Sequence, residues 1–484
     1  MKTSLALLAI LFLGGSSAGA LAAATTAEAQ RLTAALQAYL GSDPGVVTVT
    51  PAGQTYALKL EAAPLFAKIK EPGFSASLSP LEMTLTDQGG GKWQVDQDQA
   101  ISFSFKAKGT FDMTGKVGKL KGSGIFDEAM GGFTSSSGDY ADFALDQTVV
   151  EKGVTTRVSY TMRKIHYETV LAPVGDGADG TIKYTMSGLT EIISAPGAAD
   201  GSTPPMDFTI IATEGSQDGT VKGLKPRASL DLMAWAVAHP SAEAMTSAQA
   251  ELKDKLRAVL PVFASIDGTS TINGLTIGTM MGQVGIARLD VAVEANGIVA
   301  DGRLREKFTV TGLTLPPGLV PPFAADLVPS SFVIDFNLRD FNLAAPAKLL
   351  IDQFDLTKDP PLPPGMEQHL LQALLPKGAV NIGLGPSAVI AKLYDLSLEG
   401  MMTAGPVATP LGEATVRLKG LDDVLAALQT APPELGLQQA TPMVMMAKGM
   451  AKTEGDGTLT WKIENTQQGG ILINGVDITK MGGQ

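Results

Sequence analysis

The stretch Val158-Ser159-Tyr160-Thr161-Met162 alternates apolar and polar residues with a period of two. This period places the apolar side chains on one side of a β-strand and the polar side chains on the other. The same pattern recurs between Val46 and Val221, at Phe74-Ala76-Leu78, Leu81-Met83-Leu85, Ile101-Phe103-Phe105, Ile182-Tyr184-Met186 and Met206-Phe208-Ile210. The sequence therefore predicts strands with one buried and one wetted face.

Glycine-rich pairs separate these runs and supply residues that tolerate positive φ, as tight hairpin turns require. They are Gly89-Gly90-Gly91, Gly131-Gly132, Asp176-Gly177, Asp179-Gly180, Asp200-Gly201 and Asp218-Gly219. We expect an antiparallel sheet of successive hairpins. Alternation returns in the second half at Leu289-Val291-Val293, Phe308-Val310 and Phe332-Ile334-Phe336-Leu338, and the last strands are expected at Thr458–Ile463 and Ile471–Asn474.

Helical spacing of apolar residues interrupts the strand pattern. Leu32, Leu36 and Leu40 form one stripe of a helix from Thr26, and Ser241 is a plausible N-cap for a segment that ends near Leu260. Further helices are expected at Ala345–Phe354, Gly365–Leu375, Leu421–Gln429 and Pro442–Lys452. The predicted fold class is α+β, β-rich, with long, mainly antiparallel sheets and amphipathic helices packed on the apolar face.

The N-terminal residues have the pattern of a cleavable export signal. Lys2 supplies a positive start, Leu5–Leu13 supply an apolar run too short to span a bilayer, and Ala20-Leu21-Ala22 supplies small residues for a peptidase. We expect cleavage after Ala22, with Ala20 and Ala24 as alternatives. Retention of the segment as an N-terminal anchor is a further alternative, which the short apolar run disfavours.

Charge and composition exclude several classes of function. Removal of Lys2 changes the formal charge from −12 to −13. The excess of acidic residues and the absence of a cluster of five or more basic residues argue against a protein that binds nucleic acid and against a polybasic segment that binds anionic lipid. The absence of cysteine removes disulfides, thiolate metal sites, cysteine catalysis and a lipoprotein anchor. No second apolar stretch is long enough to cross a membrane.

The length predicts more than one lobe. About 460 mature residues exceed what a single core organises. Because Ala, Leu and Met replace Gly and Thr from Pro226 onward, we expect a signal peptide (1–22), a β-rich N-terminal lobe (23–225), a helical insert (226–265) and a mixed β/α C-terminal lobe (266–484).

Two glycine motifs occur without the context that their chemistry needs. Gly15-Ser16-Ser17-Ala18-Gly19 spells a nucleophile elbow but lies in the predicted signal peptide. Gly175-Asp176-Gly177-Ala178-Asp179-Gly180 spells a dinucleotide fingerprint, but a strand pattern follows it where a helix is required. A hairpin loop is favoured there. The two aspartates lack the third carboxylate and the bidentate Glu of a calcium loop.

The titratable residues form no catalytic pattern in the sequence. His166, His239 and His369 are far apart, and none has the spacing of a zinc motif. The carboxylate pairs Asp96/Asp98, Asp352/Asp355 and Asp422/Asp423 lack the aromatic platforms of a sugar cleft, since aromatics are 6% of the chain. We therefore predict no catalytic, cofactor-binding or metal-binding residue and no cofactor. A triad assembled from distant residues is left open.

Two softer patterns carry alternatives. Methionines gather in the second half at Met280-Met281, Met401-Met402 and Met443/Met445/Met446/Met450, where core filling is favoured over an adaptable apolar groove. A Gly-Leu-Thr phrase recurs at Gly188-Leu189-Thr190, Gly274-Leu275-Thr276 and Gly312-Leu313-Thr314, with an echo at Asn474-Gly475. A repeated β-turn-β unit and coincidence are both left open.

The chain resembles the uncharacterised bacterial family DUF2125. The resemblance rests on the expected export, the absence of cysteine, the amphipathic strands, the Gly-Leu-Thr phrases and the closing Gly469-Gly470-Ile471-Leu472-Ile473-Asn474-Gly475. More distantly, the chain is similar to the YdgA-type family, DUF945. The resemblance implies an envelope-facing location in a Gram-negative bacterium and supplies no catalytic residues.

The sequence favours a non-enzymatic periplasmic envelope protein that binds an apolar ligand such as a lipid chain. The alternative is a structural or partner-binding envelope protein without a ligand groove. A hydrolase assembled from scattered residues is the third hypothesis.

Overall fold

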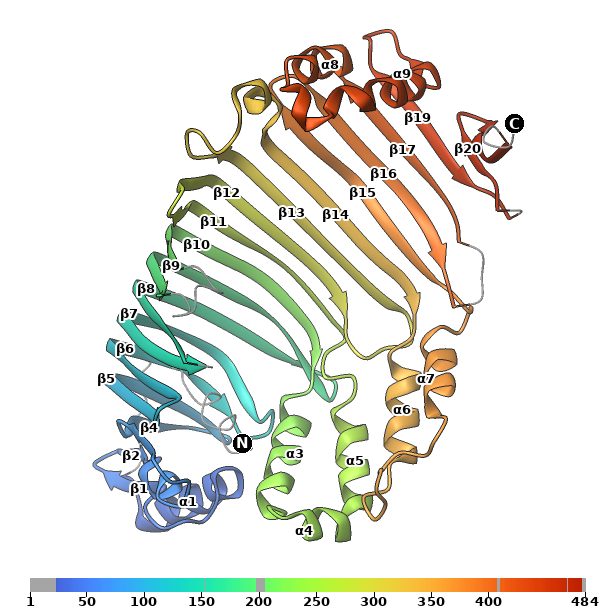
Figure 1. Cartoon of the computed structure of the whole chain (residues 1–484). Coiled ribbons are helices and arrows are strands. Elements are labelled where there is room, and N and C mark those ends of the chain that lie inside the picture. The colour runs from blue at the N-terminus through green and yellow to red at the C-terminus, as the bar shows by residue number, and fades with distance from the viewer. Residues whose placement is uncertain (1–22, 152, 197–204, 407–409, 468, 481–484) are drawn as a thin grey trace. The chain divides into compact units, whose positions relative to one another are not determined.

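The computed structural model describes residues 23–151, 153–196, 205–406, 410–467 and 469–480 (Figure 1). The predicted signal peptide lies outside these residues. The chain divides into two compact units: the first runs to Ser265 and also contains Leu350–Pro363, and the second contains Ile266–Leu349 and Pro364–Gln484. Long antiparallel strands with interspersed helices confirm the α+β class.

The first unit is built on a meander of antiparallel strands. They are β1 (Val47–Ala52), β2 (Thr55–Leu60), β3 (Phe74–Leu78), β4 (Leu81–Gly89), β5 (Lys92–Ala107), β6 (Phe111–Asp127), β7 (Gly132–Glu151), β8 (Val154–Val174), β9 (Gly177–Ala195) and β10 (Met206–Leu224). Their order is β1-β2-β4-β5-β6-β7-β8-β9-β10, and β3 pairs with the end of β5. Each neighbouring pair from β4 to β10 is consecutive in the chain, as the hairpin prediction requires.

The core of the first unit lies where helix α1 (Thr26–Leu40) covers one face of the first strands. Leu32 and Ala29 of α1 join a buried cluster with Leu58, Met83 and Trp93. The Thr25 side chain caps the helix by accepting a hydrogen bond from the Glu28 amide at 3.2 Å. The stripe predicted at Leu32, Leu36 and Leu40 therefore faces the sheet, with Leu32 buried and the other two packed at its margin.

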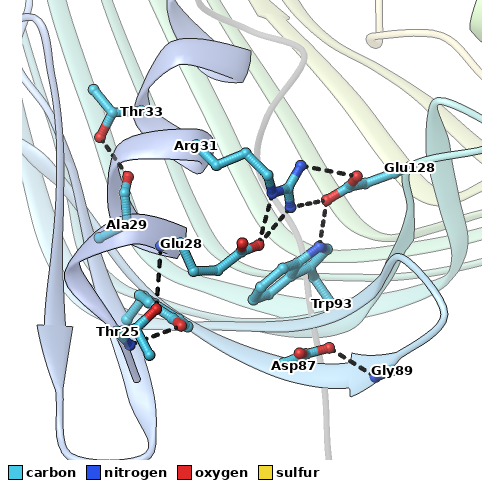
Figure 2. Close-up of polar contacts among 10 residues, drawn as sticks. Thr25, Glu28, Ala29, Arg31, Thr33, Asp87, Gly89, Trp93 and Glu128 are labelled. Atoms are coloured by element: carbon cyan, nitrogen blue, oxygen red, sulfur yellow. Dashed lines mark hydrogen bonds and ion pairs between the residues drawn. The ribbon is translucent and has the colours of Figure 1, made fainter. Parts of the chain in front are cut away.

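A polar network fixes α1 to the turn between β6 and β7 (Figure 2). Arg31 binds both carboxylate oxygens of Glu128, at 2.7 and 3.2 Å, and also pairs with Glu28. The Trp93 indole donates to the Glu128 carboxylate at 2.6 Å. Partial burial of the Glu128 carboxyl raises its pKa, but the hydrogen bonds from Arg31 and Trp93 outweigh burial and hold the pKa below its usual value.

A row of interruptions crosses the sheet from β6 to β10. The ladder skips a residue on each strand at one level, and these residues are Gly118, Asp142, Arg163, Gly188 and Thr213. Two consecutive residues are exposed there on β6, β8 and β10, for example Arg163 and Lys164. Val117 and Leu120 nevertheless lie in the same buried cluster. The alternation therefore slips by one, and the apolar side chains stay on one face.

The recurring Gly-Leu-Thr phrase lies inside strands rather than at turns, and at Gly188 and Gly312 it coincides with an interruption of the ladder. Gly188, Gly274 and Gly312 lie inside strands, with φ of 65°, 60° and 67°. The β-turn-β interpretation is wrong for these three, because a left-handed glycine can also lie inside a strand, and the local sequence does not distinguish that position from a turn. Asn474-Gly475, by contrast, has φ of 49° and 84° and forms a two-residue hairpin turn between β20 and β21.

Helices α3 (Pro226–Ala238), α4 (Ala242–Ser247) and α5 (Gln249–Val259) follow β10 in the first unit, and the short α2 (Ala63–Phe66) precedes β3. Ser241 caps α4, as predicted, by accepting a hydrogen bond from the Ala244 amide at 3.1 Å. Lys253 of α5 lies over the Phe354 ring at 4.7 Å and donates to the Asp352 carbonyl. These contacts explain why the segment Leu350–Pro363 belongs to the first unit.

The second unit repeats the meander. Its strands are β11 (Ser265–Thr279), β12 (Gly282–Asn296), β13 (Gly302–Thr314), β14 (Pro329–Phe341), β15 (Val380–Ala391), β16 (Asp395–Ala404), β17 (Leu411–Lys419), β18 (Lys452–Thr453), β19 (Leu459–Asn465), β20 (Ile471–Ile473) and β21 (Val476–Asp477). From β12 the order is β12-β13-β14-β15-β16-β17-β19-β20-β21, all antiparallel, and β18 pairs with the start of β19.

The predicted helices of the second half are confirmed within one or two residues at most ends. They are α6 (Ala344–Gln353), α7 (Met366–Leu374), α8 (Leu421–Gln429) and α9 (Thr441–Gly449), with 3-10 helices η1 (Pro322–Leu327), η2 (Pro433–Leu435), η3 (Leu437–Ala440) and η4 (Ile478–Lys480). Helix α8 packs on the sheet, where Leu421 and Leu425 form a buried cluster with Leu459 and Trp461. Val444 of α9 packs against the same cluster.

We expect Glu128→Gln to lower the thermal midpoint at neutral pH and to flatten its decline in acid. A carboxyl whose pKa is depressed by folding stabilises the fold above its unfolded pKa, near 4.5, and loses that contribution as the pH falls through the folded value. The variant has no such contribution to lose. Circular dichroism melts at neutral pH and at about pH 3.5 measure the difference. Glu71→Gln, at an exposed residue, is the control, and equal acid dependence of all three proteins would contradict the assignment.

We expect Gly312→Ala to destabilise the second unit by about 1–2 kcal/mol, because its φ of 67° is unfavourable for a residue with a Cβ. The added Cβ would also lie 2.7 Å from the Ala287 Cβ. Gly455→Ala is the matched control, since Gly455 has open space around its Cβ position and no positive φ. Thermal unfolding followed by circular dichroism should show a lower midpoint for the first variant only.

Candidate functional site

The register of β7–β10 gathers apolar side chains on one face of the first sheet. Phe143, Met162, Leu189 and Ala212 are opposite one another across the four strands. The same face continues on both sides of the interruption row. We call it the first apolar face, and its main members are Phe143, Leu145, Val158, Tyr160, Met162, Ile165, Tyr167, Tyr184, Met186, Leu189, Ile193, Phe208, Ile210 and Ala212.

Helix α1 covers only the beginning of this face. The buried cluster beneath α1 extends to Tyr140 and Phe143 of β7 and no further. On β8–β10 the buried residues of this face are Met162, Tyr167 and Ala212, with Ala178, Ala195 and Val221 toward the strand ends, and the other main members there are half-buried. Such partial burial, over strands of 21, 19 and 19 residues, is typical of an apolar surface that lacks a second layer.

Large side chains lie flat over glycines of neighbouring strands and close the gaps within this face. A Cβ on Gly138 would meet the Tyr167 ring, and a Cβ on Gly215 would meet the Met186 side chain. Phe103 lies over Gly115 in the same way. A large side chain that covers a cross-strand glycine shields backbone from water. The sheet thus fills part of its own surface.

One carboxylate interrupts the first apolar face. Glu191 is opposite Tyr160 of β8 and Ile210 of β10 and is half-buried. Among the residues that the structure describes, its carboxylate has no hydrogen-bond or ion-pair partner. Burial raises the pKa of the Tyr160 hydroxyl, and the nearby Tyr184 and Glu191 raise it further.

The second unit has an equivalent surface, the second apolar face. Its members alternate along β12–β16 and are Leu289, Val291, Val293, Phe308, Val310, Phe332, Ile334, Phe336, Leu384, Val389, Leu396 and Leu398. Ile334 is 44% exposed. Glu306 lies on this face opposite Val293 and Phe336 and, within the described part of the chain, also has no polar partner. Both units therefore combine an uncovered apolar face with one unpaired glutamate.

The opposite faces of both sheets are polar and carry ion pairs. In the first unit Asp139 binds Lys164 and His166, each at 2.9 Å. In the second unit Arg305 donates two hydrogen bonds to Asp335, which is 2% exposed, at 2.9 and 2.7 Å. The hydrogen bonds from Arg305 hold the pKa of the Asp335 carboxyl below its usual value. Each sheet therefore has a clear division into a polar and an apolar side.

A shallow hollow of about 740 Å³ lies on the polar side of the first strands. Its charged lining residues are Lys59, Glu82, Asp96, Asp98 and Lys121. The Asp96 carboxylate also accepts hydrogen bonds from Gln94, at 3.0 Å, and from Ser123. No aromatic side chain lines the hollow. The predicted pair Asp96/Asp98 thus lies on an open polar surface without the platform of a sugar-binding cleft.

The three histidines lie in separate places. His166 is on β8 between Asp139 and Glu168, with Nδ1 2.9 Å from Asp139 and Nε2 3.4 Å from Glu168. His239 ends α3, where its ring stacks on Trp235 with centroids 4.4 Å apart, and His369 is exposed on α7. Among the described residues, none of the three imidazoles has a hydroxyl or thiol as a hydrogen-bond partner.

The remaining sequence candidates have structural contacts. The motif of residues 175–180 forms the turn and first residues of the β8–β9 hairpin, as expected. There Asp176 pairs with Lys225, and Asp179 accepts a hydrogen bond from the Gly223 amide at 2.7 Å. Asp352 binds Arg257 at 2.9 Å. Asp355 accepts hydrogen bonds from Thr357, and Asp422 pairs with Lys448.

The core-filling interpretation of the methionine clusters is wrong for most of them. Met280, Met281, Met401, Met443, Met445 and Met446 are between 50% and 72% exposed. The exposure of these methionines could not be predicted from the sequence. A hairpin tip, or a short helix with apolar residues on all sides, has the same apolar composition as a buried segment.

In the part of the chain that the structure describes, no helix is long and apolar enough to cross a membrane. No group of three or more His, Asp or Glu side chains there is arranged to hold a metal ion.

Comparison of the chain with models of known protein families, with curated proteins and with solved structures finds no match.

We expect Glu191→Leu to leave the fold intact and to raise the thermal midpoint, because a half-buried carboxylate without a partner costs free energy, on the order of 1 kcal/mol. Glu214→Leu, at an exposed residue of β10, is the control and should change little. Thermal unfolding monitored by circular dichroism gives both values. A lower midpoint for Glu191→Leu would mean that the carboxylate stabilises the fold through contacts that the structure does not show.

Proposed function

We propose that this is an exported, non-enzymatic protein of the bacterial periplasm that binds the acyl chains of lipids on its apolar sheet faces. The observation that carries the proposal is the first apolar face, where half-buried Val158, Tyr160, Ile193 and Phe208 face solvent without a helical cover. The predicted signal sequence favours the same compartment.

The dimensions of the face suit acyl chains. Strands β8–β10 contain 19 to 21 residues, which corresponds to a length of roughly 60 Å. Four neighbouring strands, β7–β10, span about 15 Å, which is the width of two or three extended hydrocarbon chains side by side. Each chain could lie along the strands without any deep pocket.

The energetics favour a ligand with more than one chain. An acyl chain that buries about 300 Å² gains about 7.5 kcal/mol, and association itself costs on the order of 4–15 kcal/mol. One chain would therefore bind weakly. Two chains gain about 15 kcal/mol for a single association cost, which permits micromolar affinity. We therefore propose diacyl or multi-acyl lipids rather than free fatty acids.

A second candidate is a structural or partner-binding envelope protein without a ligand. The flat packing of Tyr167 over Gly138 and of Met186 over Gly215 favours it, because the sheet already covers part of its own surface. The two candidates differ in whether the acyl chains of a lipid bind on the first apolar face.

Adjacent residues of β9 provide a test with a matched control. Ile193 lies on the first apolar face opposite Val158 and Phe208, whereas Ile192 lies on the polar side opposite Ser159 and Thr209. We expect Ile193→Asp to weaken binding of a fluorescent diacyl phospholipid about tenfold and Ile192→Asp to leave it unchanged. Fluorescence titration with detergent-free protein measures both, after circular dichroism has shown that both variants fold.

The same protein, purified from the periplasm, is examined by native mass spectrometry and organic extraction. A co-purifying diacyl lipid supports the proposal. No binding by the unmodified protein, or equal loss in both variants, would overturn it in favour of the ligand-free candidate.

A further inference from the structure

Exposed apolar side chains gather at one end of the second unit's sheet. Because its strands are antiparallel and sequential, the starts of β12, β14, β16 and β19 share that end with the ends of β13, β15 and β17. Figure 1 shows α8 and α9 at this end of the strands. We call the exposed apolar residues there the methionine rim, and they are Met280, Met281, Leu319, Leu435, Met443, Met445 and Met446.

Several residues of the methionine rim have large apolar side chains that are largely exposed. Met280, Met281 and Met443 are 72%, 71% and 70% exposed. They belong to three separate connections: the β11–β12 turn, the β13–β14 loop and the segment between β17 and β19. Apolar residues scattered singly over a surface are ordinary, but a set from three connections at one end defines a surface.

Helix α9 is held so that its methionines point away from the core. Val444 packs on the cluster around Leu459 and Trp461. The Trp461 indole donates to the Ala447 carbonyl at 2.7 Å, and Lys448 pairs with Asp422 of α8. These contacts hold one side of the helix on the sheet and leave Met443, Met445 and Met446 in solvent.

The charges at this end of the sheet disfavour a negatively charged binding partner. The connections 315–328, 391–395 and 419–458 contain four lysines and seven carboxylates. Each lysine pairs with a carboxylate: Lys392 with Asp326, Lys419 with Asp456, Lys448 with Asp422 and Lys452 with Glu454. The end is therefore net negative, which disfavours anionic lipid.

We infer that the methionine rim docks onto the surface of an electrically neutral lipid bilayer. Methionine is long, unbranched and flexible, so separate protruding tips can each enter a fluid acyl layer. A protein partner would instead need one surface complementary to three separate protrusions. The inference goes beyond ligand binding on the apolar faces, because docking requires only the rim.

Vesicle flotation of the full-length mature chain with phosphatidylcholine vesicles tests the inference. We expect the unmodified protein to float with the vesicles and Met443→Gln/Met445→Gln/Met446→Gln to lower the bound fraction about tenfold or more. Met280→Gln/Met281→Gln, on a different connection, should also lower it. The control Met401→Gln/Leu371→Gln changes residues that are 54% and 41% exposed toward the opposite end of the sheet and should bind as the unmodified protein does.

Binding that persists at high salt supports insertion of apolar side chains. The inference is overturned if the unmodified protein does not float, if the control loses as much as the rim variants, or if flotation requires anionic lipid and is lost in salt. Self-association through the rim, detected by light scattering and abolished by the same substitutions, would also overturn it in favour of a second copy of the chain. Because Ile193→Asp leaves the rim unchanged, failure of docking and failure of lipid binding are distinguishable.

Discussion

The structure depends on strict alternation of side chains across an antiparallel ladder that is continuous over many strands. A shift of one residue in any strand would move all its apolar side chains to the polar side. The interruption row shows how the strands satisfy this constraint. Strands β6–β10 all skip a residue at one level, and the apolar sequence of each strand also shifts by one there, as Met162 and Ile165 on either side of Arg163-Lys164 show. Backbone geometry and sequence pattern slip together, so the apolar face is preserved.

A sheet with an apolar face normally buries it under a second layer. In the first unit α1 packs on a cluster that extends from β1 to β7, and in the second unit α8 and α9 pack on residues of β17 and β19. Between those covers the sheets depend on their own side chains. Tyr167 and Met186 lie over glycines of the next strand, which lowers the exposed apolar area without a helix. The same solution leaves Glu191 and Glu306 among apolar neighbours, where a second layer would have made an unpaired carboxylate costlier.

Much of this fold could be predicted from the sequence because its signals are local. Alternation at Val158–Met162, the helical stripe from Thr26 and the Ser241 cap each depend on neighbours within one turn or one strand. The positions of Gly188, Gly274 and Gly312 inside strands could not be predicted, since a left-handed glycine has the same sequence signature inside a strand and in a turn. The hydrogen bonds of Glu128 could not be predicted from the sequence either, because Arg31, Trp93 and Glu128 are brought together only by the packing of α1 on the sheet.

The candidate site was less predictable than the fold for a related reason. A catalytic site can be recognised in a sequence from residue types with special chemistry, such as histidine. In this protein His166, His239 and His369 lie in separate places. The first apolar face consists of ordinary Val, Ile, Tyr and Met residues, and only the absence of a covering element distinguishes it from a core. That absence is a property of the whole unit. Ile192 and Ile193 show how small the local difference is, since two identical neighbouring side chains lie on opposite faces and only the cross-strand register assigns one to the apolar side.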